Sequence, residues 1–390
     1  MNSPTNRILY VQYTNPACYP PLGHSSRILA DSGWKVLFLG TGAFNKADDL
    51  AFQKHPLIFV KKMPYCSNRL FLKLHYLIYC LWVLSRLFLF RPQWIYVSDP
   101  ISCPVAFMSS LFSNCRIIYH EHDSPNPEKH DMKLLDRLVL ACRYKLLEAA
   151  ALCIFPNEDR MKLAPMYDKR PEKFFCVWNC PSHEEVSLPE KLQAKGDFWL
   201  LYHGSIVPDR LPFTVIQALK LLPEYVKLRI IGYVTIGQER YLDQLRAFSE
   251  QAGLSRRIEY LGILQRNALL KYSQNCSVGI ALMPKVGNNV NMRHMVGASC
   301  KAFDYMACEL PLLVSDLSDW KSLYVAAGYA LACNPDDPQS IATAIMWYLD
   351  NPVTMKKMGT SGMKQILASW NYEKQFQPVM DHIHLPMGAQ

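Results

Sequence analysis

Residues 297–304 combine the residue types that hold a phosphate group. Gly297, Ser299 and Lys301 close a polar loop, and an apolar helical pattern begins directly after them. The unpaired N–H groups at the start of a helix and a nearby lysine both attract an anion. Lys301 and Asp304 lie three residues apart and share one face of the predicted helix. One of them would meet a phosphate and the other a ribose hydroxyl.

A second phosphate-binding pattern lies in the segment LLYHGSIVPDR. An apolar strand is followed by Gly204 and Ser205 in a predicted turn, and Arg210 precedes the next helix. A leaving diphosphate carries negative charge, and an arginine beside helix-terminal N–H groups neutralises that charge without a metal. Arg210 is the first candidate for this role, and an exposed arginine at a helix start is the alternative.

Four polar residues follow an apolar strand in the first half of the chain, namely His120, Glu121, His122 and Asp123. If the strand persists, alternation turns the two histidines to one side of it. Hydrogen bonding to a sugar or a phosphate is the favoured role, and plain loop polarity is the alternative. A metal would need a further ligand cluster, which the sequence does not show, so a metal site is disfavoured.

Gly23 follows the first strand, where a dinucleotide-binding fold would carry the pattern G-x-G-x-x-G. The other two glycines are missing, so a dehydrogenase is disfavoured. A turn that contains Gly23 is predicted to open a helix and to let the backbone approach a ligand closely. No D-x-D motif suggests a metal either, because Asp336 and Asp337 occupy a turn that caps a helix.

Short apolar strands alternate with helical stretches along the whole chain, from RILYVQY to YALAC. This rhythm predicts parallel sheets covered by helices. The polar stretch at residues 179–197 reads as a linker. We therefore expect two doubly wound, Rossmann-like α/β domains, at residues 1–182 and 183–365, that face a cleft with the carboxyl ends of their strands.

The 390 residues are 50% hydrophobic and 19% charged, which suits two folded domains that each bury a core. The 13 cysteines form an odd set without metal-ligand spacing, so reduced thiols in a cytoplasm are expected. The first residues lack a signal-peptide pattern, which also favours a location inside the cell. No nucleic-acid partner is predicted.

Residues 51–100 hold seven lysines or arginines and one acidic residue, Asp99. Within them, residues 70–90 would span about 31 Å as a helix, close to the thickness of a bilayer core. Lys73, His75 and Arg86 interrupt this stretch, so a helix packed in the fold or lying on a membrane is favoured over a span. Docking on anionic lipid to reach a lipid-linked acceptor and a buried helix with a solvated basic rim both remain open.

The chain resembles the retaining glycosyltransferases of family 4 from about residue 5 to about residue 380, most strongly in its second half. Members of that family share a stretch of the type S-P-x-K-x-F-E-Y-M-A-x-G-x-P-V. The matching residues are Ser299, Lys301, Phe303, Asp304, Tyr305, Met306, Ala307 and Pro311. Further similar segments are HGSIVPDR, CVWNCP, SVGIALMP, PDDPQSIATAI and WNYEKQF.

The resemblance implies the GT-B fold, with residues 366–390 as a helix that crosses back to the first domain. It also implies that Asp304 contacts the donor ribose as the second acid of an E-x7-E motif. Val296 takes the place of the first acid, so the sugar contacts would shift to N–H groups near residues 297–299. Ser205 stands where many relatives carry arginine, and Arg210 matches the next basic position.

The remaining donor contacts implied by the resemblance lie at the ends of strands. Gly204 and Gly232 would border the donor, and residues 261–264, with Gly262 and Leu264, would line the pocket for the base. His122 corresponds best to the family's histidine beside the donor sugar, with His120 in reserve. Asp123 and Asn291 are secondary candidates.

The implied reaction moves a sugar from a UDP- or GDP-linked donor to a glycan or a lipid-linked saccharide with retention of configuration. Arg210 and Lys301 would stabilise the leaving diphosphate, and His122 would orient the sugar. No cofactor and no metal are expected. The alternatives are a sugar-nucleotide epimerase of the same fold and a non-catalytic, membrane-attached scaffold, which the changes at Val296 and Ser205 would suit.

Overall fold

The structure, a computed structural model, describes residues 6–68, 70–125, 133–186, 196–235 and 237–384. The chain forms two compact units. The amino-terminal unit consists of Met1–Asn179, Asn289–Ala298 and Tyr372–Gln390, and the carboxy-terminal unit of Cys180–Asn288 and Ser299–Asn371. Part of the predicted linker, residues 187–195, lies outside the described residues.

The amino-terminal unit is built on a seven-stranded parallel sheet with the order β3-β2-β1-β4-β5-β6-β7. The strands are β1 (Arg7–Val11), β2 (Lys35–Thr41), β3 (Ile58–Met63), β4 (Trp94–Ser98), β5 (Arg116–His120), β6 (Leu152–Phe155) and β7 (Phe174–Cys176). The apolar sequences of β1, β2, β4, β5 and β6 follow from burial on both faces of the sheet, whereas β3 at the edge is largely exposed. The strand order reverses between β1 and β4, which is where open parallel sheets bind ligands.

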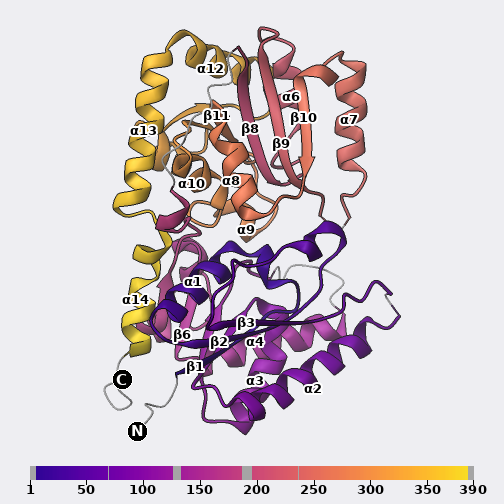
Figure 1. Cartoon of the computed structure of the whole chain (residues 1–390), viewed down its shortest axis with the longest axis vertical. Coiled ribbons are helices and arrows are strands. Elements are labelled where there is room, and N and C mark those ends of the chain that lie inside the picture. Colours follow the sequence, from indigo (N-terminus) through magenta and orange to yellow (C-terminus); the bar gives the residue numbers. More distant parts are fainter. Residues whose placement is uncertain (1–5, 69, 126–132, 187–195, 236, 385–390) are drawn as a thin grey trace. The chain divides into compact units, whose positions relative to one another are not determined.

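Alternation along the strands divides the side chains of this sheet between two cores. Ile8 and Tyr10 of β1 point into the core under α1 (Pro20–Asp31) and α14 (Tyr372–His384). Leu9 and Val11 point into the opposite core, which is covered by α2 (Leu72–Phe90), α3 (Cys103–Phe112) and α4 (Leu134–Ala149). Figure 1 shows these three helices beside the sheet. The short helix α5 (Glu158–Lys162) follows β6.

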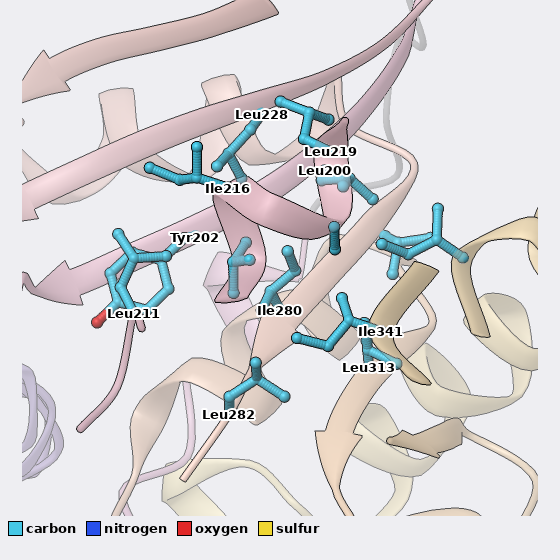
Figure 2. Close-up of a cluster of buried hydrophobic side chains, with 14 of the residues drawn as sticks. Leu200, Tyr202, Leu211, Ile216, Leu219, Leu228, Ile280, Leu282, Leu313 and Ile341 are labelled. Carbon is cyan, nitrogen blue, oxygen red and sulfur yellow. The ribbon is translucent and has the colours of Figure 1, made fainter. Parts of the chain in front are cut away.

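The carboxy-terminal unit has a six-stranded parallel sheet with the order β10-β9-β8-β11-β12-β13. Its strands are β8 (Phe198–Ser205), β9 (Val226–Tyr233), β10 (Ile258–Gly262), β11 (Val278–Ala281), β12 (Leu312–Ser315) and β13 (Ala330–Cys333). One core of this unit joins Leu200 and Tyr202 of β8 to Ile216 and Ile341 of two covering helices (Figure 2). The prediction of two doubly wound parallel sheets is confirmed.

Five helices of the carboxy-terminal unit lie between successive strands, namely α6 (Phe213–Leu219), α7 (Tyr241–Gln251), α8 (Arg266–Gln274), α10 (Cys300–Ala307) and α11 (Ser318–Trp320). The helices α12 (Pro338–Asp350) and α13 (Pro352–Ala368) follow the last strand, β13. Asp337 caps α12, and its side chain accepts a hydrogen bond from the Gln339 N–H, as predicted for this turn. The short helix α9 (Val290–Arg293) lies in the inserted segment at residues 289–298, which belongs to the amino-terminal unit. The sequence analysis did not foresee this insertion.

Two local predictions are wrong. The helix that contains Gly23 already begins at Pro20, because proline favours the first helical positions, so Gly23 lies inside α1 and not in a turn before it. Gly204 and Ser205 also do not form a turn, since they are the last two residues of β8.

Helix α2 is, among the described residues, the one helix that is long and apolar enough to cross a membrane. This property by itself is weak evidence for a span, because a core helix can pass the same test. Part of α2 is buried, with Tyr76, Tyr79, Cys80, Val83 and Leu87 facing the sheet.

Candidate functional site

Lys301 lies directly above the end of β8 in the carboxy-terminal unit. A Cβ added to Gly204 would come within 2.9 Å of the Lys301 Cε and 3.2 Å of its Nζ. The Lys301 ammonium also lies 5.1 Å from the centre of the Tyr202 ring. Glycine is therefore required at position 204, both for this close approach and for its φ of +110°.

Arg210 extends the same positive region. Its Nη1 donates a hydrogen bond of 3.1 Å to the Ser205 Oγ at the end of β8. Burial and the charge of Arg210 lower the pKa of Lys301 to about 7. Among the described residues, no carboxylate forms an ion pair with Lys301. This edge of the sheet therefore carries two neighbouring cations whose mutual repulsion an anion would relieve.

Gly232 is the second-last residue of β9, beside β8, and has no room for a side chain. A Cβ at this position would lie 1.8 Å from the Gly204 carbonyl oxygen. Gly262, at the end of β10, has a φ of +70° and open space around its Cβ position. Glycine is thus favoured at these two positions for different reasons. Close packing favours it at position 232, and the backbone conformation favours it at position 262. Leu264 lies two residues beyond β10 and is half-buried.

Asp304 lies on α10 and is bound by Arg266 of α8. The Arg266 Nη1 and Nη2 atoms donate to the two Asp304 oxygens at 2.7 and 2.6 Å. Arg266 also donates to both Glu185 oxygens, at 2.8 and 2.9 Å. The charges of the two carboxylates hold the pKa of Arg266 well above its ordinary value. The buried Asp304 carboxylate is therefore held in place by its arginine partner.

His203 completes this network at the end of β8. Its Nε2 lies 3.4 Å from an Asp304 oxygen, and its backbone N–H donates to the Tyr305 hydroxyl at 2.9 Å. Burial, followed by the positive charges of Lys301 and Arg266, keeps the pKa of His203 well below its ordinary value. His203 is thus neutral, and the positive charge of the region is carried by the lysine and the arginines.

Ser299 precedes the first turn of α10 and makes no side-chain capping bond. The first N–H groups of an α-helix have no partner within the helix, so this terminus favours a negative group. Lys301 stands in the same turn. The structure therefore brings Lys301, Arg210, Gly204, Gly232 and the start of α10 into one unit, as the prediction of a phosphate site requires.

Two buried histidines lie at the end of β5 in the amino-terminal unit. The centres of the His120 and His122 rings are 3.9 Å apart. The His120 Nδ1 is 2.6 Å from the Tyr96 hydroxyl, whereas His120 Nε2 and both ring nitrogens of His122 have no hydrogen-bond partner among the described residues. Burial lowers the pKa of His122 to about 3, so its ring is neutral at physiological pH. A buried ring with two unpaired nitrogens suits a polar, uncharged ligand.

Asp99 lies beside these histidines at the end of β4. The His122 N–H donates to its Oδ1 at 3.1 Å, and the Gln12 Nε2 donates to its Oδ2 at 3.4 Å. Desolvation and the nearby Asp123 raise the pKa of Asp99 to about 7. The φ of Asp99 is +65°, which is rare for a residue with a side chain and is found most often at functional sites.

The inserted segment is fastened to the amino-terminal unit by the buried Arg160. Its Nη1 donates to the His122 carbonyl at 3.0 Å, and its Nη2 donates to the Asn291 carbonyl at 2.6 Å. Asn291 also exchanges two hydrogen bonds of 2.8 Å with the backbone of Ser124. Asp123 is largely exposed and lies 3.6 Å from Arg160. Asn291 therefore has a structural task, since it joins the insertion to the loop after His122.

The residues of the loop before α10 divide between the two units. Val296 and Gly297 belong to the amino-terminal unit, and Ser299 to the carboxy-terminal unit. Gly297 has a φ of +79°, and a Cβ there would come within 2.5 Å of the Trp178 ring. Its carbonyl accepts a hydrogen bond from the Asn179 N–H at 2.7 Å. Close packing thus explains why residue 297 is a glycine.

Gly23 is likewise explained by packing, since a Cβ there would lie 3.2 Å from the Phe52 ring. Its predicted contact with a ligand stays a prediction. No group of three His, Cys, Asp or Glu side chains that could hold a metal ion occurs among the described residues.

Sequence reasoning missed four polar residues of these two sites. Gln12 and Asp99 each follow an apolar strand directly, and that position is a signal that could have found them. Arg160 and Arg266 gave no such signal, because arginines at the start of a helix are common on protein surfaces. Their partners come from elements far away in the sequence.

The comparisons with known proteins identify the class. Residues 185–365 match the family model of the glycosyl transferases group 1. A comparison with curated protein sequences gives no significant match. Solved structures of glycosyltransferases share the fold over nearly the whole chain.

HepE of Anabaena in complex with UDP and glucose is 16% identical, with a TM-score of 0.74, and the match covers 97% of this chain and 99% of HepE. Sucrose-phosphate synthase of Thermosynechococcus elongatus is 15% identical, with a TM-score of 0.68 and coverage of 96% and 98%. A trehalose-6-phosphate structure from E. coli, bound with UDP-2-fluoro glucose, is 17% identical, with a TM-score of 0.66 and coverage of 98% and 100%.

The fold is therefore the GT-B fold of glycosyltransferases. Within that class, the part of this chain that is similar to the glycosyl transferases group 1 is residues 185–365. The phosphate-binding candidates Lys301 and Arg210 lie inside this matched range, whereas His120, His122 and Asp99 lie outside it.

Proposed function

We propose that this protein transfers a sugar from a UDP- or GDP-linked donor to a hydroxyl of a glycan or a lipid-linked saccharide, with retention of the anomeric configuration. The observation that carries the proposal is the pair of cations, Lys301 and Arg210, at the end of β8 beside the start of α10. This arrangement fits a diphosphate, which would replace the missing anionic partner of Lys301. The complexes of HepE with UDP and of the E. coli structure with UDP-2-fluoro glucose support the same class of donor.

In the proposed reaction, the bond between the sugar C1 and the diphosphate oxygen breaks, and a bond from C1 to the acceptor oxygen forms on the same face. A leaving phosphate oxygen takes the proton of the acceptor hydroxyl. Lys301, Arg210 and the first N–H groups of α10 stabilise the charge that grows on the diphosphate. These groups supply the required charge, so the proposal includes neither a metal nor a cofactor.

Asp304 is proposed to accept a hydrogen bond from the donor ribose. A carboxylate has about four acceptor positions, and the bonds from Arg266 use two of those of Asp304. Arg266 fixes the direction of the carboxylate, which lowers the entropic cost of binding a ligand.

His122 is proposed to bind a hydroxyl of the donor sugar. Its neutral ring offers one N–H donor and one nitrogen acceptor, and both are unpaired among the described residues. Asp99 accepts from the His122 backbone N–H and holds this residue in place. His120 would support the His122 ring, because the two ring centres lie 3.9 Å apart with an angle of 40° between the ring planes.

The experiment that tests the donor assignment is a thermal-shift series with UDP, GDP, ADP and their sugar derivatives. A ligand that binds only the folded protein raises its Tm. We expect a UDP or GDP compound to do so, and we expect Arg210→Ala and Lys301→Ala each to weaken its binding about 10- to 100-fold, as the loss of a charge-assisted hydrogen bond does. Lys220→Ala, which removes an exposed lysine after α6, is the matched control.

An unchanged Tm response in both site variants would refute the phosphate assignment. Nucleotide binding without transfer to any acceptor would favour the non-catalytic scaffold. Interconversion of two donor sugars without an acceptor would favour the epimerase. Retention is checked by the anomeric proton coupling of the product.

A further inference from the structure

The outer side of α2 is apolar although it faces solvent. Leu77 and Leu81 are 55% and 57% exposed, and Leu89 is 72% exposed. The other large exposed side chains of α2 are Leu72, Leu74, Ile78 and Phe88. Their spacing of three or four residues places most of them along one stripe of the helix. Solvent-facing helices of soluble domains carry polar residues on this side, so the stripe marks a contact surface.

The inner side of α2 ties the helix to its domain. The Tyr79 hydroxyl donates to the Leu39 carbonyl at 3.0 Å, and the Tyr76 hydroxyl donates to the Ile101 carbonyl at 2.8 Å. Val83 and Leu87 are buried in the same core. The helix also connects β3 to β4 within one parallel sheet. A membrane span would remove these groups from the core, so the helix can meet a bilayer only along its outer side.

Helices α3 and α4 continue the apolar surface on the same face of the sheet. Leu111 and Phe112 of α3 are 65% and 60% exposed, and Leu134 and Leu138 at the start of α4 are also exposed. The three helices pack against one core and lie beside one another (Figure 1). The exposed apolar residues therefore form an extended surface on one side of the amino-terminal unit.

The charges beside this surface are basic. From Leu70 to Phe112 the sequence holds three basic residues, Lys73, Arg86 and Arg91, and one acidic residue, Asp99. The carboxylate of Asp99 is engaged by Gln12 and the His122 N–H at the end of β4. Lys73 and Arg91 are exposed at the two ends of α2. A negatively charged surface would complement them.

An open cavity of about 1010 Å³ lies where α2 and α3 end. Its lining includes Phe88, Arg91, Phe112 and Arg116. The cavity thus combines apolar walls with cationic side chains at the border of the apolar surface. A phospholipid has the matching chemistry, because its acyl chains are apolar and its phosphate is anionic.

We propose that the outer sides of α2 and α3 form a docking surface for an anionic lipid bilayer, with α2 lying in the plane of the membrane interface. The leucines and phenylalanines enter the boundary between headgroups and acyl chains, while Lys73 and Arg91 bind lipid phosphates. This inference concerns a surface outside the donor site and does not depend on the proposed transfer reaction.

The experiment is sedimentation of the purified full-length chain with vesicles of phosphatidylcholine alone or of equal parts phosphatidylcholine and phosphatidylglycerol. We expect binding to the anionic vesicles that high salt weakens, because salt screens the basic residues. Neutralising both Lys73 and Arg91 to glutamine is expected to weaken binding roughly 25-fold, at about fivefold per charge. The variant Leu77→Gln with Leu81→Gln is expected to abolish it.

Matched controls lie in the carboxy-terminal unit. The pair Val286→Gln and Val353→Gln changes two side chains that are 78% and 82% exposed. The pair Lys356→Gln and Lys357→Gln removes two exposed lysines. Both control pairs are expected to bind vesicles as the unchanged protein does, and circular dichroism melting checks that every variant folds.

Three results would overturn the proposal. The first is absence of binding to anionic vesicles. The second is binding of the protein to both kinds of vesicle in a form that alkaline carbonate does not release. Such binding indicates a helix that spans the membrane. The third is a dimer in light scattering that Leu77→Gln with Leu81→Gln converts to a monomer, because the surface would then bind a second copy of the chain. UDP binding serves as the internal control. The docking surface lies outside the donor site, so UDP binding is expected to stay unchanged whether or not the protein binds vesicles.

Discussion

The carboxyl edges of the two sheets differ in charge although the folds are alike. In the carboxy-terminal unit, β8 ends under Lys301 and beside Arg210. In the amino-terminal unit, Asp99 follows β4, and the neutral His122 lies two residues beyond β5. The same edge of the same architecture thus carries cations in one unit and weakly ionised groups in the other.

This difference shows that the fold places the ligand edge, while a few side chains decide which ligand chemistry it suits. Cations and a helix start suit a diphosphate, and unpaired neutral imidazole nitrogens suit sugar hydroxyls. Each unit also contains an arginine that is paired with a buried carboxylate. Arg143 donates to Glu121 in the amino-terminal unit, and Arg266 to Asp304 and Glu185 in the carboxy-terminal unit.

Replacing these two arginines is expected to give the largest effect and tests whether the two units respond differently. Arg143→Met and Arg266→Met each leave a buried carboxylate without its partner, which is expected to cost about 3 to 5 kcal/mol of unfolding free energy. Urea unfolding measures this cost. Below the unfolding transition, Arg266→Met should also weaken UDP binding, because Asp304 loses the partner that fixes it, whereas Arg143→Met should bind UDP normally.

Equal UDP binding by both arginine variants would contradict a role for Arg266 in the donor site. Equal loss in both would mean that unfolding, and not the site, explains the effect.

The variant His122→Ala tests whether the carboxyl edges of the two sheets have different functions. The variant is expected to bind UDP normally and to lose about 100-fold in the rate of sugar transfer, because misplacing the donor sugar costs rate without affecting the nucleotide. Nucleotide titration and a transfer assay give the two readouts. His55→Ala is the control, since His55 pairs with Asp31 at a distance from the site. Full transfer activity in His122→Ala would remove His122 from the site.

The smallest expected effect is the change of donor affinity with pH. With a pKa of about 7, Lys301 of the free protein loses its charge as the pH rises above 7, and a bound diphosphate favours the charged form. The affinity for UDP-glucose should therefore be constant below pH 7 and fall about tenfold by pH 8. Titration calorimetry measures this fall, and Lys301→Arg should not show it, because arginine stays charged.

His122 should contribute nothing to the pH profile between pH 5 and pH 9, because its pKa of about 3 keeps the ring neutral throughout. A fall in affinity that persists in Lys301→Arg would assign the ionisation to another group, for which Asp99, with its pKa of about 7, is the first candidate.

Local sequence was sufficient to predict both sheets and the residues around Lys301. Each strand is a short apolar run, and the pattern from Ser299 to Pro311 joins a helix start, a buried helix face and a strand within one continuous segment. Such features depend on neighbours in the sequence, so composition and spacing reveal them. Even here, the helix start at Gly23 and the end of β8 were placed wrongly by a few residues.

Only the tertiary structure decided the partners of the ionisable groups. Arg266 reaches Glu185 and Asp304 across the carboxy-terminal unit, and Arg160 fastens an insertion more than a hundred residues away in sequence. The pKa values of Lys301 and Asp99 follow from burial and from charges that distant elements supply. Charge and polarity are properties of the residue type, and the sequence alone determines them. Desolvation and pairing are properties of position in space, and they arise only when the chain folds.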